Sequence, residues 1–251
     1  MITLWDFIKF VLPSRRLRMK VQNVLGPYFF GKQFLIPIKQ RAELIFWEQH
    51  FKTYGEAPET EYYRKFMMDM GGMEDQAFFN NLICLDIGCG PRGSLTWLTN
   101  ARAAIGIDPL SDQYMRLGIA SHNMIYLSSP AERIPLPSHY IDVVFSMNSL
   151  DHVDKLIEVC SEIRRVLKPG GYFIGSLNLD EPKTIAEPFT LTEELLQRHL
   201  FSGWEKEFYK IRPKPRDEKG NVTYRYFYED CPEELLKAPG PRALWCRMRV
   251  K

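Results

Sequence analysis

Residues 84–98 read CLDIGCGPRGSLTWL, and the glycines Gly88, Gly90 and Gly93 within them have the spacing G-x-G-x-x-G. Glycines at this spacing let a backbone turn tightly and approach a ligand closely. After an apolar run, the pattern is typical of a nucleotide-binding loop at the end of a strand in a parallel α/β sheet. The stretch therefore predicts such a sheet. It leaves open whether the loop receives a pyrophosphate or a positively charged ligand.

Two residues of this loop favour a cationic ligand. Asp86 would place a carboxylate beside a pyrophosphate, where like charges repel. Pro91 removes one of the N–H donors that a phosphate-binding loop uses. S-adenosylmethionine carries an ammonium and a sulfonium, so a nearby carboxylate would stabilise it. Arg92 is the residue that supports the pyrophosphate alternative.

The sequence after residue 82 alternates between short β-rich runs and helical runs, which predicts βαβ units. The β-rich runs are LICLDI, AAIGID, NMIYL, IDVVFSMN and GGYFIGSLN, and later WEKEFYKIR and ALWCRMRV. A helix, DKLIEVCSEIRRVLKPGG, is predicted before the fifth run and ends at residues 168–171. Asp108 ends the second run, about 20 residues after the loop, where an acid can bind ribose hydroxyls. The alternative is that Asp108 and Pro109 only begin a turn.

Helices are also predicted on both sides of this region. RAELIFWEQHFKTYG and PETEYYRKFMMDMGG each carry an apolar stripe and end at glycine, and Thr190 with Glu193 predicts a capping box. In the segment 213–242, tyrosines at 224, 226 and 228 alternate with other residues, which predicts an extended strand with a tyrosine face. That face would line an aromatic pocket or pack on the domain.

Composition limits the classes of function. The chain has 251 residues, 45% of them hydrophobic, and 33 basic against 31 acidic residues, so charge gives no argument for a nucleic-acid partner. Its five cysteines form no C-x-x-C pair, so no metal site or disulfide framework is indicated and a cytoplasmic location is expected. Residues 1–20 are apolar and then basic, and Pro13 interrupts them too early for a membrane span. They predict a helix docked on its own domain or, alternatively, a peripheral membrane contact.

Four motifs in order resemble class I S-adenosylmethionine-dependent methyltransferases, in particular the type 11-like group that acts on small molecules. They are LDIGCG, GIDP, PAERIPLPSHYIDVVFSMNSLDHV and EIRRVLKPGGYF, and the resemblance covers about residues 80–178. It implies an α/β fold: a Rossmann-like, mostly parallel seven-stranded sheet that ends in an antiparallel hairpin. The expected parts are a helical N-terminal extension or lid (1–75), the cofactor-binding core (76–212), an aromatic insertion (213–242) and the terminal strand (243–251).

The resemblance also implies a set of site residues. Two positions depart from the family pattern, because Arg92 stands where a third glycine is usual and Pro130 stands where an aspartate is common. Glu132 could replace that aspartate at the adenine or could be a helix-start acid. The implied roles are the methionine part for Asp86, Gly88, Cys89 and Gly90, the ribose for Asp108 and Pro109, the adenine for Ala131 and Glu132, and the neighbourhood of the methyl donor for Ser146 and Asn148.

His152 is the candidate catalytic base if the acceptor is a hydroxyl, and the alternative is that it packs or caps a helix. Nucleic-acid methylation is disfavoured, since neither an N-P-P-Y-like run nor a Pro-Cys nucleophile follows the fourth predicted strand. We therefore expect methyl transfer from S-adenosylmethionine to a small molecule, at oxygen. The alternatives are a membrane-associated enzyme of a lipid or prenylated precursor, and a non-catalytic binding protein with the same fold. The sequence determines neither the acceptor nor the oligomeric state.

Overall fold

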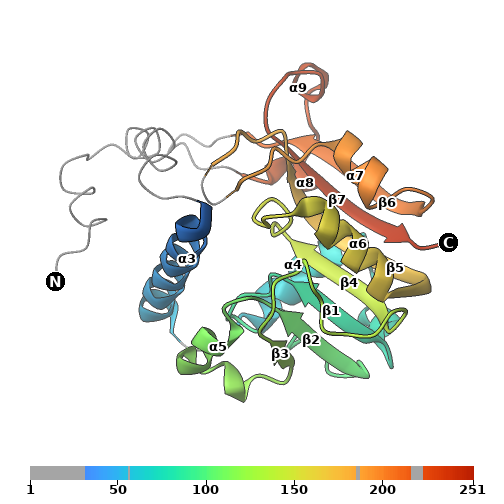
Figure 1. Cartoon of the computed structure of the whole chain (residues 1–251). Coiled ribbons are helices and arrows are strands. Elements are labelled where there is room, and N and C mark those ends of the chain that lie inside the picture. Colours follow the sequence, from blue (N-terminus) through green and yellow to red (C-terminus); the bar gives the residue numbers. More distant parts are fainter. Residues whose placement is uncertain (1–31, 56, 185–186, 216–222) are drawn as a thin grey trace, which may run out of the picture.

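A computed structural model describes residues 32–55, 57–184, 187–215 and 223–251, and its centre is a seven-stranded sheet with the order β3-β2-β1-β4-β5-β7-β6 (Figure 1). β7 runs antiparallel to β5 and β6, and the other neighbouring strands are parallel. The mostly parallel sheet with a terminal hairpin is therefore confirmed. The strands are β1 (Ile83–Ile87), β2 (Ala103–Ile107), β3 (Ile125–Leu127), β4 (Ile141–Met147), β5 (Leu167–Leu179), β6 (Glu205–Pro213) and β7 (Arg242–Arg249).

Helices cover both faces of this sheet, giving three layers. α6 and α7 pack on one face, and α4 and α8 pack on the other. Figure 1 shows α3 away from the sheet, next to α5. The helices are α3 (Lys32–Tyr54), α4 (Thr60–Gly71), α5 (Ser111–Tyr114), α6 (Leu156–Val166), α7 (Glu193–His199), α8 (Arg225–Tyr228) and α9 (Glu233–Leu236), with 3₁₀ turns at Gln76–Phe79, Met115–Leu117 and Ile119–Ser121.

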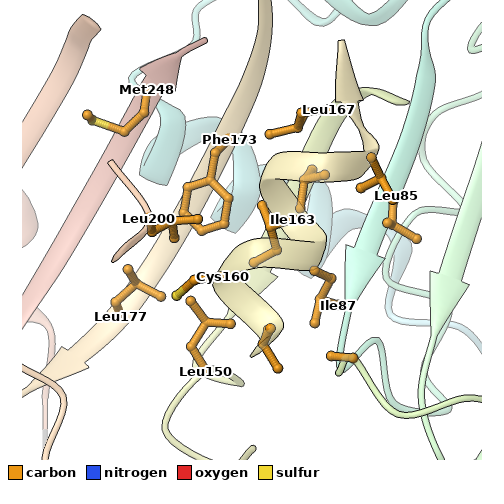
Figure 2. Packing of buried hydrophobic residues seen from close by; sticks show 14 of the residues in the cluster. Leu85, Ile87, Leu150, Cys160, Ile163, Leu167, Phe173, Leu177, Leu200 and Met248 are labelled. Carbon is orange, nitrogen blue, oxygen red and sulfur yellow. The ribbon is translucent and has the colours of Figure 1, made fainter. Parts of the chain in front are cut away.

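The apolar stripe of α6 forms the centre of the first layer. Figure 2 shows Cys160 and Ile163 of this helix directed toward Phe173 and Leu177 of β5. All four side chains are buried. Cys160 and Ile163 share one face of the helix because they are three positions apart, and Phe173 and Leu177 share one face of the strand because they are four positions apart. This packing fixes the loop between β4 and α6 at the carboxyl edge of the sheet.

α4 packs against the opposite face through its methionines. Met67 and Met70 are buried in one cluster with Trp245 of β7. The helix ends as predicted at a glycine, since Gly72 adopts the left-handed conformation and its N–H bonds to carbonyls of the last turn. α4 lies within the expected N-terminal extension and contributes to the sheet core, and the boundary at residue 75 stays a prediction.

Two predicted helix ends are wrong. Thr192, and not Thr190, caps α7, because its Oγ accepts a hydrogen bond from the N–H of Leu195 at 3.2 Å. α6 stops at Val166, and the stretch 168–171 belongs to β5 as a bulge. There Leu167 pairs with Ile141 and the next pair joins Tyr172 to Val143.

The predicted tyrosine face is also wrong, because residues 225–228 form the short helix α8. Tyr224 and Phe227, three residues apart, both contact the ring of Trp245, with centroid distances of 5.8 and 4.8 Å. Tyr228 is 62% exposed on the other side. Packing on Trp245 selects a helical turn over the alternation that the sequence suggested.

The predicted N-terminal helix in residues 1–20 lies outside the described residues. Its docking or membrane contact therefore stays a prediction. Among the helices that the structure describes, none combines the length and the apolar composition needed to cross a membrane.

Candidate functional site

The glycine loop follows β1 directly and is held closely from two sides. Gly88 and Gly90 have φ values of +70° and +56°, in the left-handed region that favours glycine. A Cβ added at Gly88 would lie 2.5 Å from the Cβ of Ser149, and one added at Gly90 would lie 3.1 Å from the ring of Trp47. The loop therefore lies between the end of β4 and helix α3.

The loop does not lead into a helix. Residues 90–97 form successive turns, and β2 follows at Ala103. A dinucleotide loop depends on a helix N-terminus for much of its attraction to phosphate. The part of the chain described between β1 and β2 lacks such a terminus, which favours the cationic alternative.

Asp86, on β1, is the buried acid of the loop. Its Oδ2 accepts a hydrogen bond from the Oγ of Ser94 at 2.5 Å, whereas its Oδ1 is buried without a hydrogen-bond partner among the described residues. Burial raises the pKa of this carboxyl to about 7. A positively charged ligand beside Oδ1 would compensate the buried charge, so the residue fits the methionine end of S-adenosylmethionine.

Asp108 links the loop to the end of β2. Its Oδ2 accepts from the N–H of Gly90 at 3.2 Å and its Oδ1 accepts from the N–H of Leu110 at 2.9 Å. Burial, followed by the charge of Glu43 on α3, raises its pKa to about 7. Pro109 is exposed beside it. Asp108 therefore begins a turn, as in the second of the two alternatives given for this residue. Its binding of ribose stays a prediction.

Helix α3 runs along the carboxyl edge of β1 and β4. Near one end, Lys39 donates a hydrogen bond to the carbonyl of His152 and lies 3.5 Å from Asp154. About one turn later Glu43 approaches Asp108, and about two turns later Trp47 covers Gly90. The helix thus contacts both the glycine loop and the loop after β4.

Further polar atoms near the loop are buried and lack partners. The indole Nε1 of Trp47 and the hydroxyl of Tyr114 make no hydrogen bond within the described residues. Tyr114 lies in one cluster with Trp47, between α3 and α5. Buried polar groups are normally satisfied, so these two atoms and the Oδ1 of Asp86 are available to a polar ligand.

Cys89 is buried between the loop and β2. A Cβ added at Gly106 would lie 2.5 Å from its Sγ. Burial raises the pKa of the Cys89 thiol, so the side chain packs as a neutral group. Only its backbone is placed to contribute to the loop.

Arg92 turns away from the loop and anchors the connection between α3 and α4. Its guanidinium donates to the carbonyl of Gly55 at 2.5 Å, pairs with Glu59 at 3.0 Å and lies 4.7 Å over the ring of Phe51. The side chain is buried. Arg92, the residue that supported the pyrophosphate alternative, therefore holds parts of the fold together.

Arg92→Ala should destabilise the fold, because it removes a buried cation and leaves the carboxylate of Glu59 with only the imidazole of His50. Loss of one member of a buried pair costs about 3 kcal/mol. Urea unfolding followed by circular dichroism measures this change. Arg64→Ala, which breaks an exposed pair with Glu61 on α4, is the control and should change the midpoint little. Equal midpoints for the two variants would contradict the anchoring role.

Ser146 and Asn148 lie at the end of β4, beside the loop. The Oγ of Ser146 and the Oγ of Ser149 are 2.8 Å apart, and Ser149 donates to the carbonyl of Ile87 at 2.6 Å. The amide of Asn148 donates to the hydroxyl of Tyr224 at 3.1 Å. These bonds bring β1, β4 and the segment before α8 together at one edge.

Ala131 and Glu132 lie farther along the chain, after β3. Ala131 is buried in the cluster around α6. The Oε1 of Glu132 accepts from the backbone N–H groups of Asp154 and Lys155, at 2.9 and 3.1 Å. Glu132 begins no helix in the described part of the chain and instead holds the segment that precedes α6, and its contact with adenine stays a prediction.

His152 is half-exposed and lies near two carboxylates that the sequence did not single out. Its Nε2 is 3.9 Å from Asp151 and 3.8 Å from Glu187. Only the adjacency of Asp151 to His152 could have indicated this group. Glu187 comes from the segment after β5, which carries no motif.

Known methyltransferases resemble this chain in sequence. Residues 85–175 match the family model described as a methyltransferase domain. Over 106 residues the chain is 35% identical to the sterol 4-C-methyltransferase strm-1 of Caenorhabditis elegans, covering 38% of this chain and 30% of that protein. Over 165 residues it is 30% identical to a ubiquinone biosynthesis O-methyltransferase of Cereibacter sphaeroides, covering 57% of this chain and 65% of that protein.

Solved structures share the fold. The crystal structure of the [4+2]-cyclase SpnF superimposes with a TM-score of 0.56 at 17% identity, covering 85% of this chain and 94% of the cyclase. At such identity the likeness concerns the fold alone. The matched methyltransferase domain, together with the sheet order and the loop, supplies the rest: residues 85–175 form a methyltransferase domain within a sheet that has the class I S-adenosylmethionine-dependent methyltransferase fold.

Proposed function

We propose that the chain binds S-adenosylmethionine at the glycine loop and transfers its methyl group to an oxygen atom of a small molecule. The observation that carries this proposal is the unpartnered, buried Oδ1 of Asp86 beside two left-handed glycines. Asp86, Asp108 and Glu43 gather at this edge of the sheet, and above the pKa of about 7 of the two aspartates the edge is anionic, which suits an ammonium and a sulfonium and repels a pyrophosphate.

The methyl transfer itself requires few catalytic groups from the protein. The acceptor oxygen attacks the methyl carbon, the carbon–sulfur bond breaks, and the sulfur leaves as the neutral thioether of S-adenosylhomocysteine. The protein has to hold the reacting atoms in line and exclude water. Helix α3, which contacts both loops at this edge, supports the proposal by covering the site.

His152 is proposed to act on the acceptor. It is half-exposed beside Asp151 and Glu187, at the same edge as the glycine loop. A neutral imidazole there can accept the proton of a hydroxyl acceptor. Oxygen is the proposed acceptor atom because a base of this kind assists an oxygen nucleophile most directly, and several relatives are named O-methyltransferases.

Calorimetry with the full chain tests the ligand. We expect saturable binding of one S-adenosylmethionine and no measurable binding of NADH, because the acidic edge repels the pyrophosphate. Tight binding of NADH with none of S-adenosylmethionine would overturn the proposal.

Labelled cofactor tests the acceptor atom. The chain is incubated with S-adenosylmethionine carrying a ¹³C-methyl group and a panel of phenols, carboxylic acids and sterols. We expect S-adenosylhomocysteine to form and the transferred methyl to show the ¹³C chemical shift of an O-methyl group. A C-methyl or N-methyl signal would contradict the oxygen assignment. A lack of turnover with every class of acceptor would favour a non-catalytic binding protein.

A further inference from the structure

Three metal-binding atoms meet beside the proposed acceptor site. One possible ligand atom each from Asp151, His152 and Glu187 lies within 4.8 Å of the other two, and the Nε2 of His152 is 3.9 Å from the Oδ1 of Asp151 and 3.8 Å from the Oε1 of Glu187. One imidazole and two carboxylates form a donor set that suits divalent first-row cations. Ligands about 2.1 Å from one ion lie about 3 Å apart, so small side-chain rotations would close the set around it.

The Oδ1 of Asp151 is an independent sign of a missing cation. Asp151 is only 5% exposed, and this oxygen is buried without a hydrogen-bond partner among the described residues. Its other oxygen, Oδ2, accepts from the amide of Asn178 at 3.2 Å. Asn178 thus orients the carboxylate while Oδ1 stays free on the side of His152. An unpaired buried oxygen of this kind is costly unless a cation approaches it.

The neighbouring lysines are engaged elsewhere. Lys214 pairs with Glu181 and donates to the Oδ1 of Asn178 at 2.6 Å. Lys39 donates to the carbonyl of His152 and approaches Asp154. Within the described residues, neither ammonium bonds to the Oδ1 of Asp151. The side chain of His152 is 41% exposed, which leaves an open side for water or an acceptor.

We propose that Asp151, His152 and Glu187 bind one divalent first-row cation, and that this cation holds the acceptor oxygen. The second part rests on the proposed function, and the first part does not. A hydroxyl bound to such an ion loses its proton to solvent more easily. The resulting oxygen attacks the methyl carbon as the carbon–sulfur bond breaks. His152 then serves as a ligand through its neutral imidazole, and the ion takes over activation of the hydroxyl.

Electron paramagnetic resonance with Mn²⁺ tests the binding. Titration of the full chain should remove the free Mn²⁺ signal with a stoichiometry of one. Asp151→Asn and Glu187→Gln should each weaken binding about tenfold or more, since each removes an anionic ligand. Glu158→Gln, an exposed acid of α6 outside the site, is the matched control and should bind as the unchanged chain does. Circular dichroism establishes that each variant is folded.

Two results would overturn the cation site. One is the absence of Mn²⁺ binding to the unchanged chain. The other is equal affinity in Glu187→Gln, Asp151→Asn and Glu158→Gln, which would place the ion elsewhere. Calorimetry with S-adenosylmethionine in EDTA separates this failure from that of the proposed function. If the cofactor binds and an acceptor is methylated in EDTA, the role of the cation at the acceptor oxygen fails and the function stands. If the cofactor does not bind with or without Mn²⁺, the function fails.

Discussion

Asp86→Asn is expected to bind S-adenosylmethionine about 2 kcal/mol more weakly than the unchanged chain, roughly a thirtyfold loss. The same variant without ligand should be more stable than the unchanged chain at pH 8. Both effects come from one buried carboxylate, whose Oδ1 has no hydrogen-bond partner among the described residues. Asparagine keeps an oxygen for the hydroxyl of Ser94 and removes the charge. Calorimetry and urea unfolding measure the two effects.

The pH dependence of this stability has a definite sign. In the unfolded chain the carboxyl of Asp86 titrates near the ordinary aspartate pKa of 3.8, and burial raises that pKa to about 7 in the folded chain. Between these values the folded state holds a proton that the unfolded state has released. Stability therefore falls as the pH rises from about 4 to about 7 and then levels off. The difference between Asp86→Asn and the unchanged chain should be small at pH 4 and full at pH 8.

Asp108→Asn is the matched control for this argument. Both oxygens of Asp108 accept backbone N–H groups, and an asparagine can offer only one acceptor. The control should therefore lose cofactor affinity without gaining stability at pH 8. If Asp86→Asn bound S-adenosylmethionine as tightly as the unchanged chain, the assigned site would be wrong.

The strands and the edge that carries the site could be predicted because they depend on local patterns. The central β-rich runs are largely apolar, as in β1, and the helix 156–166 has a clear apolar stripe. The order of the family motifs then predicted that the last two strands form an antiparallel hairpin. Asp86 and Asp108 were found in the same way, since each ends an apolar run.

Residues whose role depends on distant partners could not be predicted. Arg92 read as a loop residue, yet its partners Gly55 and Glu59 lie more than 30 positions earlier. Glu132 binds the backbone before α6, and residues 225–228 form a helical turn because Tyr224 and Phe227 pack on Trp245. In each case a contact across the fold decided among local alternatives of similar strength.

Gly88→Ala should be among the most destabilising single changes in the chain. An alanine there adopts an unfavourable left-handed backbone, which costs about 1 kcal/mol. Its Cβ would also lie 2.5 Å from the Cβ of Ser149, and such overpacking costs about 1–3 kcal/mol more. Urea unfolding should show a total loss of about 3 kcal/mol. Cofactor affinity should fall too, because the loop must move away from β4.

Gly118→Ala separates the two causes. Gly118 has a φ of +86°, and a Cβ added there has nothing within 4 Å. This control carries the backbone strain alone and should cost about 1 kcal/mol. Equal losses at the two glycines would contradict the close approach of the loop to Ser149.

A double-mutant cycle locates the clash itself. Ser149→Gly removes the Cβ that an alanine at residue 88 would meet, although it also removes the bonds to Ile87 and Ser146. Gly88→Ala should therefore cost less in the Ser149→Gly background than in the unchanged chain, with a coupling of about 1–2 kcal/mol. The same cycle with Gly118→Ala should be additive. Coupling at residue 88 alone would mean that β1 and β4 hold the glycine loop and the loop after β4 in one fixed arrangement.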